Sequence, residues 1–169
     1  MKITAVLNEV LRPVGFKRAG GMSWLRYRKP LLTRVSYYGS WYGGPGFLDV
    51  AMTISEVPIE KQRTGNWEAM NRIYTLIPSG PKIDELMKKE LTDQKALILK
   101  TVLQEEAVPL LEKLADPEQA AKIIGAGNWL GRNKFLERLA GLIKESSDAN
   151  AIAGPQSGLG RISVSCNSH

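Results

Sequence analysis

The side chains that could form a binding site stand out before residue 50, where they are cationic or aromatic rather than nucleophilic. No acidic residue occurs between Glu9 and Asp49, and residues 1–49 carry a balance of +6, which equals the net charge of the whole chain. Guanidinium and ammonium groups bind anions, and aromatic rings stack on planar groups. The pattern predicts a binding surface for an anion or an acidic partner, formed by Lys17, Arg18, Arg26, Arg28, Arg34, Tyr38 and Tyr42.

The sequence offers few residues for nucleophilic catalysis or metal binding. Cys166 is the one cysteine and His169 the one histidine, so no Cys/His metal site, His-based triad or Cys–His pair can be assembled from them. No phosphate-loop or dinucleotide-binding pattern occurs. The glycine-rich Gly43–Gly46 contains Pro45, which lacks an amide donor, and it predicts a hairpin turn. The sequence therefore predicts no cofactor and favours a non-enzymatic protein.

One carboxylate lies close to the basic residues in the sequence. Asp49 falls within Phe47–Ser55, whose alternation is typical of a half-buried strand. Two interpretations stay open for this side chain. It is either an ion-pair partner of Arg26 or Arg34, or a residue of the binding site itself.

The elements that must position these side chains begin with a short helix and continue as strands. An apolar stripe with helical spacing predicts the helix over Ile3–Leu11. Alternating residues separated by Gly- or Pro-containing turns then predict an antiparallel meander of four to five strands. The strands are expected at Phe16–Arg18, Met22–Arg28, Thr33–Tyr42, Phe47–Ser55 and Arg72–Ile77.

The second half of the chain is predicted to be helical. An apolar face runs from Ile83 to Val102 as one helix, Pro109 interrupts the pattern, and a short helix follows. The run Asp116-Pro117-Glu118-Gln119 is a strong helix start, and a last helix is expected to end near Lys144. The fold class is α+β, with an N-terminal helix, the meander, and about four C-terminal helices packed on the sheet.

The domain boundaries follow from length and composition. Residues 1–145 are predicted to form a single α+β domain, because a chain of 169 residues suits one core. Residues 146–169 are rich in Ser, Gly, Ala and Asn. Their few apolar side chains cannot offset the conformational entropy of ordering the segment, so a disordered tail is expected.

The turn after the first helix reads Leu11-Arg12-Pro13-Val14-Gly15-Phe16-Lys17-Arg18, followed by Gly20, Trp24 and Arg26. Two interpretations of this turn stay open. In one, Pro13 and Gly15 fix the exit from the helix and Phe16 fills the core. In the other, Lys17 and Arg18 contact a partner. This stretch resembles the opening of the bacterial family catalogued as domain of unknown function 4304, and the likeness covers roughly residues 3–125. The resemblance implies an α+β fold, no known activity and no catalytic residues to carry over. Tyr38 departs from the family, which often has Gln there.

Two functions suit a basic, aromatic sheet. The preferred hypothesis is a small protein-interaction module, immunity- or antitoxin-like, whose partner is an acidic protein. The alternative is a single-stranded nucleic-acid-binding protein, because such sites combine basic groups with stacking aromatics. A plainer interpretation also stays open, in which Trp24, Tyr37 and Trp41 lie in the core and the Lys and Arg residues only keep the outer face soluble.

Composition indicates where such a protein would work. No apolar run approaches the roughly 20 residues of a membrane span, and the N-terminal stretch lacks the pattern of a signal peptide. A single cysteine allows no internal disulfide. A reducing cytoplasm is therefore the expected compartment, with no membrane association.

Overall fold

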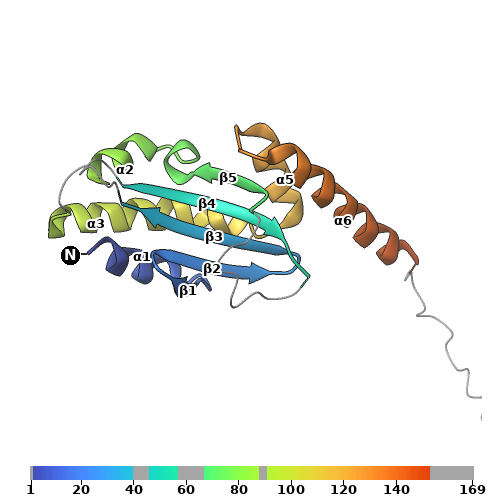
Figure 1. Cartoon of the computed structure of the whole chain (residues 1–169), viewed down its shortest axis with the longest axis horizontal. Helices are drawn as coiled ribbons and strands as arrows, with labels where there is room; N and C mark the ends of the chain where they lie inside the picture. Colours follow the sequence, from blue (N-terminus) through green and yellow to red (C-terminus); the bar gives the residue numbers. More distant parts are fainter. Residues whose placement is uncertain (1, 40–45, 57–66, 88–90, 153–169) are drawn as a thin grey trace, which may run out of the picture.

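The computed structural model describes residues 2–39, 46–56, 67–87 and 91–152, and its centre is a five-stranded antiparallel sheet (Figure 1). The strands follow one another across the sheet in chain order, so the predicted meander is confirmed. The strands are β1 (Lys17–Gly20), β2 (Ser23–Arg28), β3 (Leu31–Tyr38), β4 (Phe47–Ile54) and β5 (Ala69–Arg72).

One helix precedes the sheet and further helices follow it, which confirms the predicted α+β class. None of the helices within the described ranges is long and apolar enough to cross a membrane. The helical elements are α1 (Ile3–Leu11), the 3-10 turn η1 (Ile73–Thr75), α2 (Gly80–Met87), α3 (Asp93–Val102), the π-helical turn η2 (Leu103–Ala107), α4 (Val108–Lys113), α5 (Pro117–Ala126) and α6 (Arg132–Ile152).

The two faces of the sheet differ in what covers them. Side chains alternate along each strand, and one set packs into the same core cluster as the helices, with α3 lying behind the sheet in Figure 1. We call this side the helix face; its buried members include Trp24, Leu31, Val35, Val50 and Met52. The opposite side, which we call the second face, carries Leu25, Arg34, Ser36, Asp49, Ala51 and Arg72, as the strand registers require.

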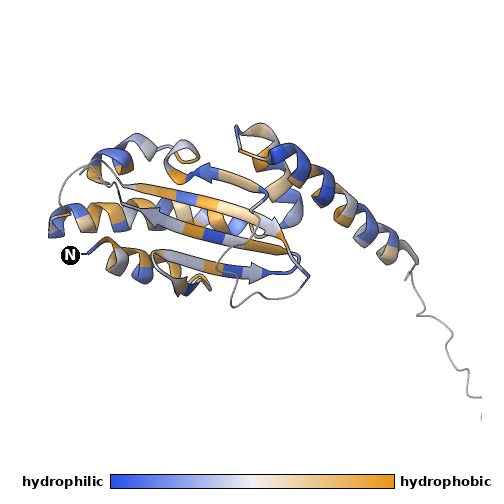
Figure 2. Ribbon diagram, in the orientation of Figure 1, coloured by the Kyte–Doolittle hydropathy of each residue, from blue (hydrophilic) through white to orange (hydrophobic). Residues whose placement is uncertain are grey.

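The helices supply the other half of the core in the spacing that the sequence predicts. Helix α1 buries Val6, Leu7, Val10 and Leu11 on one stripe. The coloured ribbons of Figure 2 show the same alternation of hydrophobic and hydrophilic segments along helices and strands. Each fully buried aliphatic side chain contributes about 1.5–3 kcal/mol relative to exposure. The helix layer therefore covers one side of the sheet, while on the second face Leu32, Ser36 and Ala51 are buried as well.

The fifth strand was misplaced by sequence reasoning. Strand β5 ends at Arg72, and the following residues form η1, where a strand to Ile77 was expected. The outer edge of β5 is already paired, because Met70 exchanges two backbone hydrogen bonds of 3.0 and 2.9 Å with Leu130. That pairing comes from a segment about 60 residues away in the sequence, so local pattern could not reveal it.

The helix predicted from Ile83 to Val102 is instead two helices, α2 and α3, and Pro109 leaves a distinct mark further on. A proline ring collides with the carbonyl four residues back in a regular helix and offers no amide donor. The chain avoids this by widening η2 to π geometry, where the amide of Val108 donates to the carbonyl of Leu103. Helix α4 then restarts with Pro109 in its first turn.

The last two helices begin as predicted, but the second is longer. The Asp116 side chain caps α5 by accepting a 2.8 Å hydrogen bond from the Gln119 amide. Helix α6 was expected to end near Lys144, yet it continues to Ile152. No Gly or Pro interrupts the chain between these two residues, so nothing in the backbone stops the helix there. The predicted disordered tail therefore begins with helical residues, and residues 153–169 lie outside the described ranges.

Candidate functional site

The structure describes six of the seven predicted binding residues, and these six do not share one side of the sheet. Lys17, Arg34 and Tyr38 lie on the second face, whereas Arg26 and Arg28 lie on the helix face. The strand registers force this split, because Arg26 is opposite Thr33 and therefore one position out of phase with Arg34. The exposed Arg18 closes the β1–β2 turn by donating to the Gly21 carbonyl at 3.0 and 3.3 Å. Tyr42 lies outside the described residues.

Arg26 is a structural residue of the core rather than a surface contact. It is only 3% exposed, and its guanidinium donates to the carbonyls of Val14 (3.2 Å) and Leu111 and to the Glu112 carboxylate. Its guanidinium carbon also lies 4.6 Å from the centre of the Phe16 ring. Burial lowers the pKa of Arg26, and the nearby Glu112 carboxylate opposes that effect. Arg26 thus ties β2 to the turn after α1 and to α4.

The same arrangement explains the turn that carries the family resemblance. Gly15 adopts a positive φ of 87°, which favours glycine, and this turns the chain so that Phe16 enters the core. Arg26 then stacks on Phe16 and donates a hydrogen bond to the Val14 carbonyl, as described above. Arg28 adds a second, 3.2 Å ion pair to Glu112 at the protein surface. The motif therefore has a sufficient structural role in this chain.

A row of polar side chains crosses the second face. Ser23 is opposite Ser36, Ser36 is opposite Asp49, and Asp49 is opposite Arg72, so the row spans β2 to β5. The hydroxyl groups of Ser23 and Ser36 lie 2.9 Å apart in a hydrogen bond. Tyr38 and Phe47 form the next pair along the sheet. We name the group around this row the second-face cluster; it consists of Arg34, Tyr38, Phe47, Asp49, Trp67, Arg72 and Tyr74.

Both arginines of the cluster are held against aromatic rings. The guanidinium carbon of Arg34 lies 4.3 Å from the centre of the Trp67 ring, and that of Arg72 lies 4.2 Å from Phe47. Arg72 also donates a 2.6 Å hydrogen bond to the Tyr74 hydroxyl. Such contacts orient a guanidinium while leaving much of its charge uncompensated, because an aromatic ring carries no net charge. The two cations are therefore preorganised for an anionic group.

Burial affects the protonation of Arg34. Burial lowers its pKa, and the electrostatic influence of the neighbouring Tyr38 and Asp49 opposes this only in part. Its Nε atom is buried and donates to no group among the described residues. Because a buried cation without full compensation is costly, an incoming anion would be bound favourably here.

Asp49 is the carboxylate that faces these two cations. Burial raises its pKa, and the neighbouring Arg72 and Arg34 oppose that rise without cancelling it. Its Oδ1 atom is buried and accepts no hydrogen bond within the part of the chain that the structure describes. Asp49 therefore neighbours Arg34 rather than Arg26, and its role in a binding site stays a prediction.

Sequence reasoning missed Phe47, Trp67, Arg72 and Tyr74. The excess of basic charge lies before residue 50, and the remainder of the chain sums to zero. Arg72 joins the site only through the register that sets it opposite Asp49 on β4. The alternation in β4 did indicate that Phe47 and Asp49 share a face, and this signal alone could have extended the predicted site.

The cluster has the chemistry of a binding surface. Two fixed guanidinium groups can hold carboxylate or phosphate oxygens, and Tyr38, 45% exposed, offers a ring for contact or stacking. Within the described ranges, no three His, Cys, Asp or Glu residues gather in a way that could hold a metal ion.

Comparison with known proteins adds no relative to this picture. No family model, curated protein or solved structure matches the chain. The resemblance to domain of unknown function 4304 therefore stays a prediction, and the candidate site rests on its own geometry.

Proposed function

We propose that this protein is a non-enzymatic interaction module that binds an acidic surface of another protein through the second-face cluster. By covering that partner it would act as an immunity- or antitoxin-like protein does. The observation that carries the proposal is the pair of guanidinium groups, Arg34 and Arg72, which are fixed by aromatic rings; Asp49 faces both, and Asp84 lies near Arg72.

The charge balance of this face supports an acidic partner. With Lys17 exposed on the same face, the cluster region carries three cations against two nearby acids, Asp49 and Asp84. Electrostatic complementarity sets specificity and association rate at protein interfaces, and arginine and tyrosine are frequent hot-spot residues. Arg72 and Tyr38 are exposed and would make first contact, while the partly buried Arg34 would gain an anion in place of lost water.

Affinity capture from the native host tests the proposal. The wild-type protein should retain a specific acidic protein, and Arg72→Ala or Tyr38→Ala should lose it without a change in circular dichroism. Lys134→Ala is the matched control, since it removes one exposed cation from α6, a helix that contributes no residue to the cluster. A capture without any specific partner, or one unaffected by the cluster variants, would refute the proposal.

A second candidate function is the binding of single-stranded nucleic acid by the same cluster. It is favoured by the exposed ring of Tyr38 next to Phe47 and two arginines, because bases stack on aromatic and guanidinium planes. Fluorescence anisotropy with a labelled oligothymidine should then show binding at about 50 mM salt that falls steeply at about 200 mM. Absence of binding at the lower salt concentration would leave the acidic protein as the partner.

A further inference from the structure

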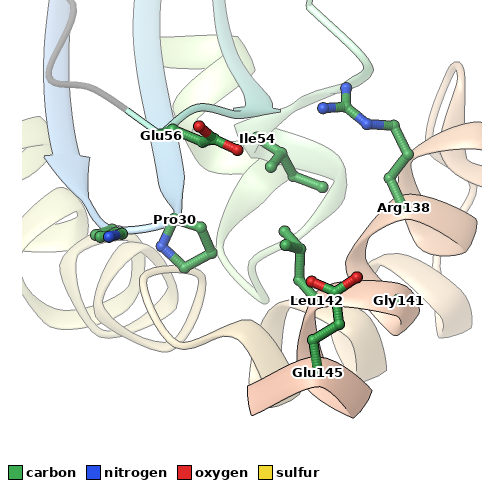
Figure 3. A pocket seen from close by; sticks show the side chains of 8 residues that line it. Pro30, Ile54, Glu56, Arg138, Gly141, Leu142 and Glu145 are labelled. Carbon is green, nitrogen blue, oxygen red and sulfur yellow. The ribbon is translucent and has the colours of Figure 1, made fainter. Parts of the chain in front are cut away.

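A groove lies at the end of the sheet opposite to Phe47, between α6 and the turn that joins β2 to β3 (Figure 3). Its volume is about 490 Å³, within the range of binding pockets. Strand β4 runs between the two surfaces, with Phe47 at the cluster end and Ile54 at the groove end. The side chains that define the groove are Lys29, Pro30, Ile54, Glu56, Leu142 and Glu145.

A second lobe extends the groove along α6 toward the start of α5. This lobe has a volume of about 250 Å³ and shares Pro30 and Leu142 with the first. The lining runs from Arg138 to Ser147 on α6, which corresponds to about 14 Å of helix. A length of about 14 Å accommodates four or five residues of extended peptide.

The floor of the groove is apolar and its walls are anchored. Figure 3 shows Leu142, Ile54 and Pro30 around the same space. Helix α6 is fixed to the body through Phe135 and Leu139, which are both 0% exposed. The turn is held by the 2.8 Å hydrogen bond from the Ser55 amide to the Pro30 carbonyl. The walls thus provide a preformed binding surface.

Carboxylates outnumber cations around the two lobes of the groove, with Glu56, Glu145, Asp116 and Glu118 against Lys29 and Arg138. Glu56 and Glu145 lie on either side of the apolar floor, and Glu118 lines the second lobe. The positive charge of Arg138 is engaged by an ion pair with Glu68. Lys29 is the other cation in the lining of the groove. The whole chain has a net charge of +6, so the carboxylates around this apolar floor differ in sign from the chain as a whole.

We infer that this groove binds an extended peptide segment of another protein that alternates apolar and basic side chains. The apolar side chains would lie on the floor formed by Ile54, Leu142 and Pro30. The Lys or Arg side chains would reach Glu145 on one side and Glu118 in the second lobe. Residues 144–149 of α6 are all exposed, so the wall that these residues form is open to such a segment. This surface is distinct from the second-face cluster and of opposite charge.

A defined peptide tests the inference without knowledge of the natural partner. The probe is a fluorescein-labelled peptide of about five residues that alternates lysine and leucine, a length matched to the groove. Fluorescence anisotropy should show saturable binding to the wild-type chain. Glu145→Lys should weaken it about tenfold or more, since like charges across an interface are strongly unfavourable. A peptide of alternating glutamate and leucine should not bind at the groove.

Matched controls separate the groove from general charge effects. Glu137→Lys makes the same charge change at an exposed position of the same helix that lines neither lobe, and it should leave binding unchanged. Arg72→Ala should also leave peptide binding unchanged, so that failure here is separate from failure of the proposed function. Absence of peptide binding, or equal weakening by Glu137→Lys, would overturn the inference. A dimer that Glu145→Lys dissociates in sedimentation would also overturn it, because a second copy would then be the occupant.

Discussion

Replacement of Arg26 by methionine is the sharpest test of how this fold is held together. Methionine has a similar length and suits a buried site, but it cannot donate hydrogen bonds. The change removes the donors to the carbonyls of Val14 and Leu111 and the ion pair with Glu112. These contacts join three segments that are far apart in the sequence, so their loss should be felt in global stability.

The magnitude follows from the burial of each partner. A hydrogen bond from a charged donor contributes about 1.5–3 kcal/mol, and a buried carbonyl left unpaired costs about 1–3 kcal/mol. The Glu112 side chain is 38% exposed, so water can solvate it once Arg26 is gone. Relief of guanidinium desolvation offsets part of the loss. We expect the free energy of unfolding to fall by about 2–3 kcal/mol, since the two carbonyls dominate.

Urea denaturation and thermal melting measure this change. A loss of about 2–3 kcal/mol should lower the melting temperature by about 4–12 °C in a domain of this size, with an unchanged urea m-value. Glu112→Gln should destabilise the wild type more than it destabilises Arg26→Met, because only the wild type is left with a buried cation and a weakened partner. The double-mutant cycle should give a coupling energy of about 1–2 kcal/mol.

Two results would refute this reasoning. If Arg26→Met is neutral or stabilising, the guanidinium costs more to bury than its contacts return, and Arg26 is not a tie between β2 and α4. If Arg26→Met and Glu112→Gln are additive within about 0.5 kcal/mol, the two side chains act independently. In either case the turn from Pro13 to Phe16 would need an explanation other than its contacts with Arg26.

Three further outcomes are expected. Gly131→Ala should lower the melting temperature markedly, because Gly131 has a φ of 77° and an added Cβ would lie 2.1 Å from the Glu68 carbonyl oxygen. Gly141→Ala is the control, because its added Cβ would meet open space on α6, and it should raise stability by about 0.5–1 kcal/mol. Burial alone would raise the pKa of Glu68, but hydrogen bonds from the Ile54 amide, Arg138 and Thr53 lower it below its usual 4.5. Thermal melts from pH 7 downward should therefore show stability lost as the pH falls below about 4.5, and Glu68→Gln should flatten that profile. Burial raises the pKa of Asp49, so ionisation of this side chain costs stability as the pH rises above about 3.8. Asp49→Asn should therefore raise the melting temperature at pH 7 but not at pH 3. A lower melting temperature of this variant at pH 7 would contradict the reasoning.

Local pattern was sufficient to predict several elements of the fold. The apolar stripe of Ile3–Leu11, the alternation in Phe47–Ile54 and the cap at Asp116 are each set by nearest neighbours in the chain. The end of α6 was misjudged because the sequence loses its apolar side chains after Ile143, whereas the backbone requires no stop before Gly154. A helix needs only helical propensity to continue, and burial is a separate matter.

The candidate site depended on longer-range information. The sequence by itself determined that this chain has one α+β core and a basic, aromatic first half without histidine or cysteine chemistry, because composition and periodicity act residue by residue. Only the tertiary structure decided which arginines are free to bind. Strand register turned Arg26 toward α4 and Arg34 away from it, and it brought Arg72 opposite Asp49. A shift of register by one residue would exchange these faces, and register is set by packing between distant segments.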